Sequence, residues 1–593
     1  MKFIGAAALF LILALGLACG GGGMPGAGGS VTLSLASGSA QAYQGQSAVT
    51  VNGNITRTGT TGNVTFRVTG LPAGASDTVT SPASGNSGSI SLNAGTAAAG
   101  TYALTVEASD GTVSDTAPLT FGVGPVVMVG SATQGSFSVA MSTAFQPASW
   151  DYQFFTLNPS APTTLENLGA QHTRLQGIEH GVPQGSEGTA STSWNFSTLD
   201  AVAQPVLNVG DHSPEFQIAK APAFMYSGNN SGSTFRDLTF APFAGYAQNL
   251  VAYYNTGGFT ANSTHYESPA YADNGYKITY WGIYNEPSIN NSLSASEYTD
   301  MYNALVPAMQ LVDPSIKFVG LEMCCSSEDW ALTFAQNVTA QVDLVASHYY
   351  SSCNQKDTDA MLMNSVPGFV WSVQTIRTNL STNPLLMNVP IWVTENNVNA
   401  DYNAGNNMSA CNQGQQFVTD VRGSSAFFAG WRPYVFSQFG KAGVQALYHW
   451  DFDADKQFGE VDYGTAALQL SYWVDYWLGK TFPASAGSQL LQFTSTDDTD
   501  METLPVVNSD GSVVVMVANH EVQTPASDNN GPGVPYNVQI DVSALGTFTS
   551  GSLVTIDKAT SAASGPTPAA VTPAGQIVVN LNGYSVGILT LTP

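Results

Sequence analysis

The sequence predicts a multidomain chain in which one α/β domain lies between two all-β domains. The chain has 593 residues, which exceeds one ordinary domain and fits two to four. Near both ends, short runs of alternating apolar residues are separated by Gly, Ser and Asp-Gly turns, which is typical of antiparallel strands. Between them, apolar runs alternate with amphipathic stretches of helical period, which is typical of a parallel sheet covered by helices.

The charge balance argues against nucleic acid as a partner. Lys and Arg together number 16, Asp and Glu together number 42, and the formal net charge is −26. Phosphate binding depends on clustered Lys and Arg, and this chain has few of either. Its hydrophobic content of 43% is ample for sizeable cores.

Residues 1–19 predict a lipoprotein-type signal peptide. A short cationic start precedes an apolar run from Phe3 to Leu17, which is too short for a comfortable membrane span. The ending Leu-Ala-Cys-Gly resembles a bacterial lipoprotein signal, in which Cys19 is acylated, although Gly16 stands where leucine is usual. Plain secretory cleavage is the alternative. Both alternatives predict an exported protein, and we expect membrane contact only through a lipid anchor on Cys19 at the cell envelope.

Residues 20–29 form a Gly-rich linker, and residues 30–124 predict a small β-sandwich. Alternating runs such as "SVTLSLAS" and "GSISLNAG" are separated by short turns in this segment. The stretches "GLPAGA" and "GTYALTVEASDGT" resemble the immunoglobulin-like modules of bacterial surface proteins. The expected role of this domain is a spacer, with carbohydrate binding as the alternative.

Residues 125–483 predict a (β/α)8 barrel, the TIM-barrel fold, because eight apolar runs alternate with helical stretches over this length. One helix is expected within residues 294–312, where Ser294 and Glu297 have the spacing of a capping box. The eight expected strands are "SFSVAM", "HTRLQGI", "EFQIAKAP", "ITYWGIY", "KFVGLEM", "DLVASHY", "PIWVTEN" and "VQALYHWDF". Residues 484–593 return to alternating runs around Asn-Gly and Asp-Gly turns, and predict a C-terminal β-sandwich packed on the barrel.

Polar side chains end several of the expected barrel strands. The active site of a (β/α)8 barrel lies at the C-terminal ends of its strands, so these side chains are expected to converge. The candidates are Arg174 after strand two, Asn285 and Glu286 after strand four, His348 and Tyr350 after strand six, Glu395 after strand seven and Trp450 after strand eight. A pair of carboxylates such as Glu286 and Glu395 is what the cleavage of a glycosidic bond requires, because one must donate a proton while the other stays ionised.

The motifs resemble those of the clan A glycoside hydrolases. "YWGIYNEP" and "PIWVTEN", with "HYY" between them, are similar to the clan's strand-four and strand-seven motifs. "WNFSTLDAV", "VDLVASHYY" and "NGYSVGILTLTP" most resemble glycoside hydrolase family 39, with families 51 and 79 as near alternatives. The resemblance covers roughly residues 130–593.

This resemblance implies a role for each candidate. Glu286 would be the acid/base and Glu395 the nucleophile of a retaining mechanism, and Asn285 would bind the sugar 2-hydroxyl. Arg174 would hold Glu395 ionised, because an adjacent cation lowers a carboxyl pKa. The remaining roles are orientation of the carboxyl groups by His348 and Tyr350. From its own chemistry, the indole of Trp450 is expected to stack on a sugar face.

The expected function is an exported, retaining O-glycoside hydrolase without cofactor or metal, which acts from a chain end on a neutral pentose-type sugar. Arg174-Leu175-Gln176 stands where family 39 often has Arg-x-His, which predicts a different contact to a sugar hydroxyl. The alternatives are a catalytically silent surface glycan-binding protein, or a retaining glycosidase specific for uronic acid or arabinofuranose. The sequence makes no prediction of the oligomeric state.

Four cysteines follow Cys19, and export permits them to form disulfides. Four cysteines allow three pairings. Because adjacent Cys324 and Cys325 cannot easily serve two distant partners, the favoured pairing is Cys353–Cys411 with a vicinal Cys324–Cys325 bond. The alternative is that one of the adjacent pair bridges elsewhere. No spacing typical of a structural zinc site is present.

Overall fold

A computed structural model describes residues 29–146, 151–176, 184–186, 189–209, 213–228, 234–290, 293–324 and 327–593. The predicted signal peptide with Cys19, and the linker up to residue 28, lie outside this described part. Within it, none of the helices is long and apolar enough to cross a membrane. The chain divides into two compact units. The first consists of the residues up to Ala42, Ser47–Ala94 and Tyr102–Phe121, and the second of Tyr43–Gln46, Gly95–Thr101 and Gly122–Pro593.

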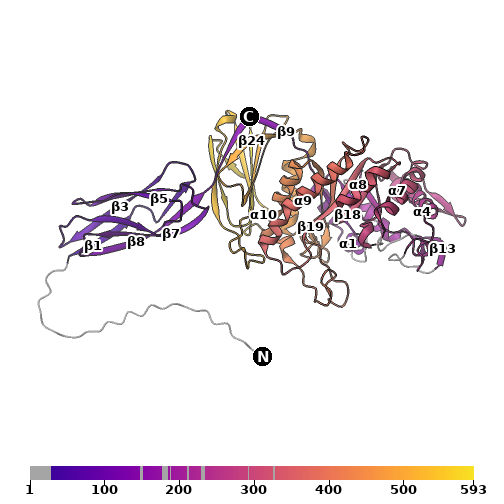
Figure 1. The fold of residues 1–593 in the computed structure, drawn as a ribbon, viewed down its shortest axis with the longest axis horizontal. Coiled ribbons are helices and arrows are strands. Elements are labelled where there is room, and N and C mark those ends of the chain that lie inside the picture. The colour runs from indigo at the N-terminus through magenta and orange to yellow at the C-terminus, as the bar shows by residue number, and fades with distance from the viewer. Residues whose placement is uncertain are drawn as a thin grey trace, which may run out of the picture. The chain divides into compact units, whose positions relative to one another are not determined.

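The first unit is the predicted N-terminal sandwich (Figure 1). Its two four-stranded sheets have the orders β1-β3-β6-β5 and β2-β8-β7-β4. The strands are β1 (Ser30–Leu35), β2 (Ser39–Tyr43), β3 (Val49–Thr58), β4 (Thr65–Thr69), β5 (Ser76–Thr80), β6 (Ser87–Asn93), β7 (Gly100–Ser109) and β8 (Ser114–Gly124). In β3 the side chains of Val51 and Ile55 are buried while their neighbours are exposed. This period of two is the alternation that predicted strands here.

The second unit contains the predicted barrel, which is closed and entirely parallel. Every expected run contributes a strand, and β19 and β20 are buried almost throughout because helices cover a parallel barrel from outside. The strands in order are β10 (Ala140–Phe145), β11 (Thr173–Leu175), β14 (Glu215–Ile218), β17 (Tyr280–Ile283), β18 (Lys317–Cys324), β19 (Leu344–Ser352), β20 (Ile391–Asn399) and β21 (Val444–His449).

Helices follow the strands as expected. The helix expected within residues 294–312 is α7 (Ala295–Gln310), and its capping box is confirmed: the Glu297 N–H donates to Ser294 Oγ, and the Ser294 N–H donates to the Glu297 carboxylate. The other long helices are α3 (Ser197–Val209), α4 (Ala241–Asn255), α8 (Ser327–Asn337), α9 (Asp359–Leu380), α10 (Ala426–Lys441) and α11 (Leu470–Thr481), with the shorter α1 (Asp151–Leu157), α2 (Ala161–Leu168), α5 (Pro269–Asn274) and α6 (Pro287–Asn290) between them.

The C-terminal part is a nine-stranded sheet of order β29-β28-β31-β26-β25-β24-β9-β27-β30. It curls into two layers, so that a methyl group on Gly587 in β31 would lie 2.6 Å from Val579 Cγ1 in β30. Eight of its strands are β24 (Gln489–Ser495), β25 (Met501–Val507), β26 (Val513–Asn519), β27 (Tyr536–Asp541), β28 (Ser550–Ile556), β29 (Ala569–Val571), β30 (Gln576–Leu581) and β31 (Ser585–Thr592).

The ninth strand corrects the predicted start of the barrel at residue 125. Strand β9 (Val126–Ser136) pairs with β24 and β27, and its Val127 and Val129 lie in the core of the C-terminal sheet. The barrel begins only at Ala140. A short apolar strand has the same sequence pattern in either sheet, so only the pairing partners distinguish the two assignments.

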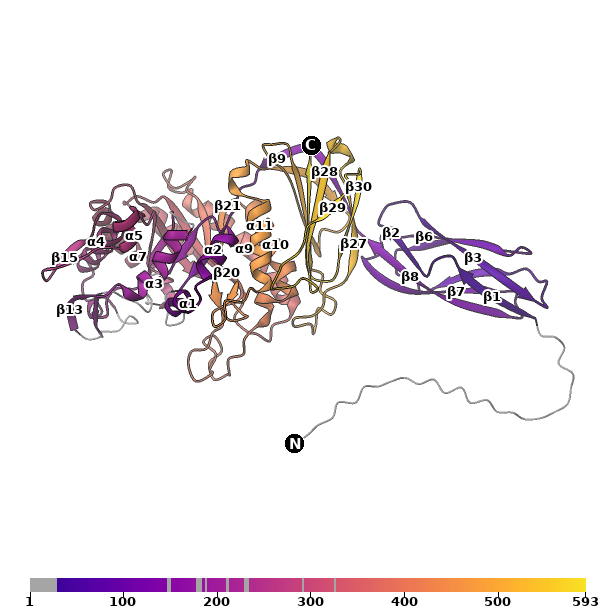
Figure 2. The same cartoon turned by 180° about the vertical axis from the view of Figure 1, so that it is seen from behind.

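The C-terminal sheet packs directly on the barrel, as predicted. Figure 2 shows α10 beside this sheet, and α10 contacts β25, β26 and β31. Glu502 in β25 accepts hydrogen bonds from Ser437 Oγ at 2.6 Å and Gln438 Nε2 at 2.8 Å, both in α10. Apolar contact and buried hydrogen bonds therefore fix the two domains of this unit to each other.

Candidate active site

The structure brings the predicted site residues together at the C-terminal ends of the barrel strands. Every one of the seven lies on or just after a barrel strand: Arg174 in β11, Asn285 and Glu286 after β17, His348 and Tyr350 in β19, Glu395 in β20 and Trp450 after β21. Contacts link six of them directly in one network, and Trp450 joins through its ring.

The backbone around Glu286 explains why strand β17 stops there. Tyr284 and Glu286 have φ angles of 71° and 43°, in the left-handed region that ordinary residues seldom adopt. The Glu286 N–H donates to Glu322 O at 2.9 Å, which holds the turn in place before α6 begins at Pro287. Such strain persists only where surrounding contacts impose it, and it is concentrated at functional sites.

The two predicted catalytic carboxylates lie close together. One oxygen of Glu286, one oxygen of Glu395 and a ring nitrogen of His348 all lie within 4.8 Å of one another. The Glu286 side chain is 17% exposed and the Glu395 side chain 6%. One carboxylate therefore reaches solvent while the other is almost enclosed.

Arg174 lies beneath these carboxylates and is fully buried. Its Nη1 donates to Glu395 Oε1 at 2.9 Å, and its Nη2 lies 3.2 Å from Asn285 Oδ1 and 3.3 Å from Glu322 Oε2. Its Nε lies 3.6 Å from Glu215 Oε1. Burial opposes the charge of this guanidinium, but the surrounding carboxylates raise its pKa further, so Arg174 is a permanent cation here.

Glu395 receives several donors besides Arg174. Tyr350 OH donates to Glu395 Oε2 at 2.8 Å, and Gln176 Nε2 lies 3.5 Å from Oε1. Burial raises the pKa of Glu395, while the charges of His348 and Arg174 and the Tyr350 hydrogen bond oppose this rise. The expected contact of Arg174 with Glu395 is therefore present, and both Arg174 and His348 favour the ionised form of Glu395.

His348 lies between three carboxylates. Its Nδ1 is 2.8 Å from Glu286 Oε1 and 3.6 Å from Glu395 Oε1, and its Nε2 is 3.2 Å from Glu322 Oε2. Burial lowers the pKa of this imidazole, but the charge of Glu395 and the hydrogen bonds to Glu286 and Glu322 outweigh burial and raise the pKa to about 9. His348 is thus a second cation of the site near neutral pH.

Trp450 lies beside Arg174. The Arg174 Cζ is 5.7 Å from the centroid of the Trp450 indole, and Trp450 is 9% exposed. This distance fits a cation–π contact. A cis peptide bond joins Trp450 to Asp451. Stacking of this ring on a sugar stays a prediction.

Sequence reasoning missed Gln217 and Thr394, which donate hydrogen bonds within this network. Gln217 Nε2 in β14 donates to Asn285 Oδ1 at 2.9 Å and to Tyr284 O at 3.1 Å. Thr394 Oγ1 donates to Glu322 Oε2 at 2.9 Å. The signal was present in the strand "EFQI", where Glu215 and Gln217 are polar residues two apart in an otherwise apolar run and therefore share one face.

The predicted Cys353–Cys411 disulfide is confirmed. It joins the end of β19 to the long loop after β20, the two strands that carry His348, Tyr350 and Glu395. Cys325 lies outside the described residues, so its predicted bond with Cys324 stays a prediction.

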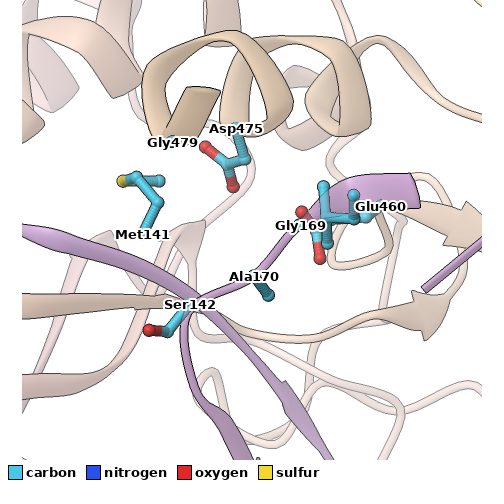
Figure 3. Close-up of a pocket in the computed structure, with 8 residues that line it drawn as sticks. Met141, Ser142, Gly169, Ala170, Glu460, Asp475 and Gly479 are labelled. Carbon is cyan, nitrogen blue, oxygen red and sulfur yellow. The ribbon is translucent and has the colours of Figure 1, made fainter. Parts of the chain in front are cut away.

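A second buried polar cluster lies near the start of β10 and has a structural role. Figure 3 shows Glu460 and Asp475 at a cavity with Ser142 and Met141. Its volume is about 10 Å³, room for about one water molecule and far too small for a sugar. Asp475 accepts from Arg432 Nε at 2.9 Å and lies 2.7 Å from His449 Nδ1, so its charge is already compensated.

Comparisons with known proteins agree with this geometry. The family described as "Glycosyl hydrolase catalytic core" matches residues 260–426, which include Glu286, His348 and Glu395. No curated protein sequence is detectably similar to the chain.

Several solved structures share the fold. A family 51 α-L-arabinofuranosidase from Thermotoga petrophila superposes with a TM-score of 0.55 at 13% identity, over 79% of this chain and all of its own. A family 39 β-xylosidase from Caulobacter crescentus gives 0.51 at 13%, with the same coverage. A glucosidase from Croceicoccus marinus gives 0.51 at 15%, over 79% of this chain and 99% of its own. The family resemblance predicted from the motifs is thus supported, and the barrel with its C-terminal β domain is the fold of these glycosidases.

Proposed function

We propose that the protein is a retaining glycoside hydrolase in which Glu286 is the acid/base and Glu395 the nucleophile. The observation that carries the proposal is the separation of the two carboxylates, with one oxygen of each within 4.8 Å. Retaining enzymes hold their carboxyl groups about 5–5.5 Å apart, whereas inverting enzymes need about 6.5–9.5 Å to admit a water molecule. The close pair supports double displacement.

The reaction has two steps. In the first, an oxygen of Glu395 bonds to the anomeric carbon while the bond to the leaving oxygen breaks, and Glu286 gives that oxygen its proton. In the second, Glu286 takes a proton from water, the water oxygen bonds to the anomeric carbon, and the bond to Glu395 breaks. Exposure of Glu286 and enclosure of Glu395 fit these roles, because only the acid/base exchanges protons with leaving group and water.

The surrounding residues have roles that follow from their contacts. The amide of Asn285 has its oxygen held by Arg174 and Gln217, which leaves its NH2 group to donate to a sugar hydroxyl. Arg174, His348 and Tyr350 stabilise the carboxylate form of Glu395, which is the form that attacks.

The proposed substrate is a neutral pentose at the end of a glycan chain. Two of the similar structures are named as an arabinofuranosidase and a β-xylosidase, which supports a pentose. Arg174 is fully buried and faces the protein's own Glu395, Glu322 and Glu215, so it offers no exposed cation to a uronic acid. Arabinofuranose and uronic acid are the alternatives to a xylose-type sugar.

The test is a panel of nitrophenyl pentosides, hexosides and uronides with wild type, Glu286→Gln and Glu395→Gln. We expect hydrolysis of one pentoside by wild type only, and proton NMR should detect the retained anomer first. Azide should restore Glu286→Gln with a glycosyl azide of retained configuration, and Glu395→Gln with an inverted one. Inversion by wild type, or full activity in either variant, would refute the assignment, and a folded protein that only binds glycans would support the alternative of a silent binding protein.

We further propose that the chain is exported and anchored to the cell envelope through Cys19, as its first residues predict. Radiolabelled fatty acid should enter the wild-type protein in a bacterial host and should not enter Cys19→Ser. Equal labelling of both proteins would contradict the anchor.

A further inference from the structure

We propose that Glu322 is a positioning residue of this site, which keeps His348 protonated on both ring nitrogens between Glu286 and Glu395. The kinetic consequence rests on the proposed function. The protonation of His348 does not, and it can be measured in a protein of any activity.

The path of β18 directs Glu322 into the barrel. The register between β18 and β19 shifts between Leu321 and Met323, so Glu322 is the extra residue of a β-bulge. Leu321 and Glu322 have φ angles of 75° and 49° in the left-handed region. Bulges next to active sites serve to re-aim a side chain. The strained backbone thus points to a role for Glu322 beyond filling space.

Three donors meet at one oxygen of Glu322, which is itself fully buried. Glu322 Oε2 lies 2.9 Å from Thr394 Oγ1, 3.2 Å from His348 Nε2 and 3.3 Å from Arg174 Nη2. Burial alone would raise the pKa of this carboxyl, but the charge of Arg174 and the hydrogen bonds from Glu215 and His348 lower it to about 2. Glu322 is therefore ionised throughout the neutral range.

The neighbouring Glu215 is protonated, whereas Glu322 is ionised. Apart from a proton shared between the two carboxyl groups, neither oxygen of Glu215 nor Glu322 Oε1 has a hydrogen-bond donor among the described residues. Both carboxyl groups face Gly282, where an added methyl group would lie 2.9 Å from Glu322 Oε1 and 3.1 Å from Glu215 Oε1. Burial and the charge of Glu322 raise the pKa of Glu215 well above its usual value. A protonated Glu215 can donate a hydrogen bond to the ionised Glu322, which gives both buried carboxyl groups a hydrogen-bond partner.

The buried charges then balance around the reacting groups. Arg174 and His348 are positive, Glu322 and Glu395 are negative, and Glu215 is neutral. The buried groups that adjoin Glu286 therefore carry no net charge in sum.

The neighbours of His348 favour the doubly protonated ring. Its Nε2 faces the ionised Glu322 while its Nδ1 faces Glu286 and the ionised Glu395, so a neutral ring would turn a nitrogen without a proton toward one of these two carboxylates. Arg174 and Tyr350 also donate to Glu395. The site should therefore lose its second cation as the pH rises through the pKa of His348, which predicts the basic limb of the rate profile.

The test measures the titration of His348 by nitrogen-15 and proton NMR in the full chain labelled at its histidines, with assignment by His348→Asn. In wild type we expect a pKa near 9, and a value near the ordinary 6.5 would overturn the proposal. This measurement requires no substitution at Glu322, so it stands even if a variant there fails to fold.

The comparison of Glu322→Gln with Glu215→Gln then assigns the cause. Both residues are fully buried and both contact Arg174. We expect Glu322→Gln to lower the pKa of His348 by at least one unit and Glu215→Gln, which mimics a protonated carboxyl, to leave it unchanged. The basic limb of kcat/KM for any glycoside hydrolysed should move by the same amount. Equal shifts in both variants, or none in Glu322→Gln, would refute the role.

Discussion

Replacing Arg174 with methionine removes one cation from among three buried carboxyl groups while keeping a side chain of similar length. The guanidinium lies 2.9 Å from Glu395, 3.3 Å from Glu322 and 3.6 Å from Glu215, measured between charged atoms. Removing one partner of a buried ion pair costs about 3–5 kcal/mol, because the remaining charge stays buried without compensation. Against a total stability of roughly 5–15 kcal/mol for a domain, this is a large loss.

The loss should depend on pH, and its sign follows from the pKa values of the carboxyl groups left without the cation. Without the guanidinium, the carboxyl groups have folded-state pKa values above the ordinary value of about 4.3. The folded state then binds more protons than the unfolded chain, so the stability of the variant rises relative to wild type as the pH falls. The deficit of about 3–5 kcal/mol expected at pH 8 should shrink toward pH 5.

Urea unfolding followed by tryptophan fluorescence measures this deficit in the barrel, the domain that contains Arg174. All 10 tryptophans lie between residues 150 and 477, so the signal reports the barrel segment. A matched control is Arg377→Met in α9, where the arginine is partly exposed and donates to a backbone oxygen, Met387 O, at 3.1 Å. We expect the control to cost less than about 1 kcal/mol at both pH values. A deficit in Arg174→Met that is below this, or equal at pH 5 and pH 8, would refute the reasoning.

Three further predictions concern the same domain. Gly282→Ala should cost about 1–3 kcal/mol of stability, because its methyl group would crowd the buried carboxyl groups of Glu322 and Glu215. In the control Gly368→Ala in α9, the methyl group has no contact within 4 Å, so this variant should be neutral or stabilised by up to about 1 kcal/mol. Equal urea midpoints for the two variants would contradict this difference. Removing the Cys353–Cys411 disulfide, which closes a loop with a sequence separation of 58, should cost up to about 4 kcal/mol; an unchanged urea midpoint in the double serine variant would exclude this. Because the pKa of His348 is raised to about 9, protonation of this ring contributes roughly 3 kcal/mol to the free energy of unfolding, which is complete below pH 6.5 and lost as the pH rises through 9. The difference in unfolding free energy between wild type and His348→Gln should therefore fall between pH 6.5 and pH 9. A constant difference would count against a charged imidazole.

Local sequence patterns were sufficient to predict most of the fold. Strand period, helix period and turn residues depend on neighbours along the chain, so the eight barrel strands, the capping box at Ser294 and both flanking β domains could be predicted. Strand β9 could not be assigned correctly, because its partners β24 and β27 lie hundreds of residues away. A strand's own residues do not specify the sheet that it joins.

The same distinction applies to the site. In a parallel barrel all strands point the same way, so the order of motifs along the chain was enough to predict that Glu286, His348 and Glu395 meet at one end. The motifs alone were thus enough to predict the class of chemistry. The place of Glu322 on a bulge of β18, near His348 and beside Glu215, could be seen only in the folded protein. Protonation in a buried cluster depends on distances of a few ångströms between residues far apart in the chain, and no local pattern encodes those distances.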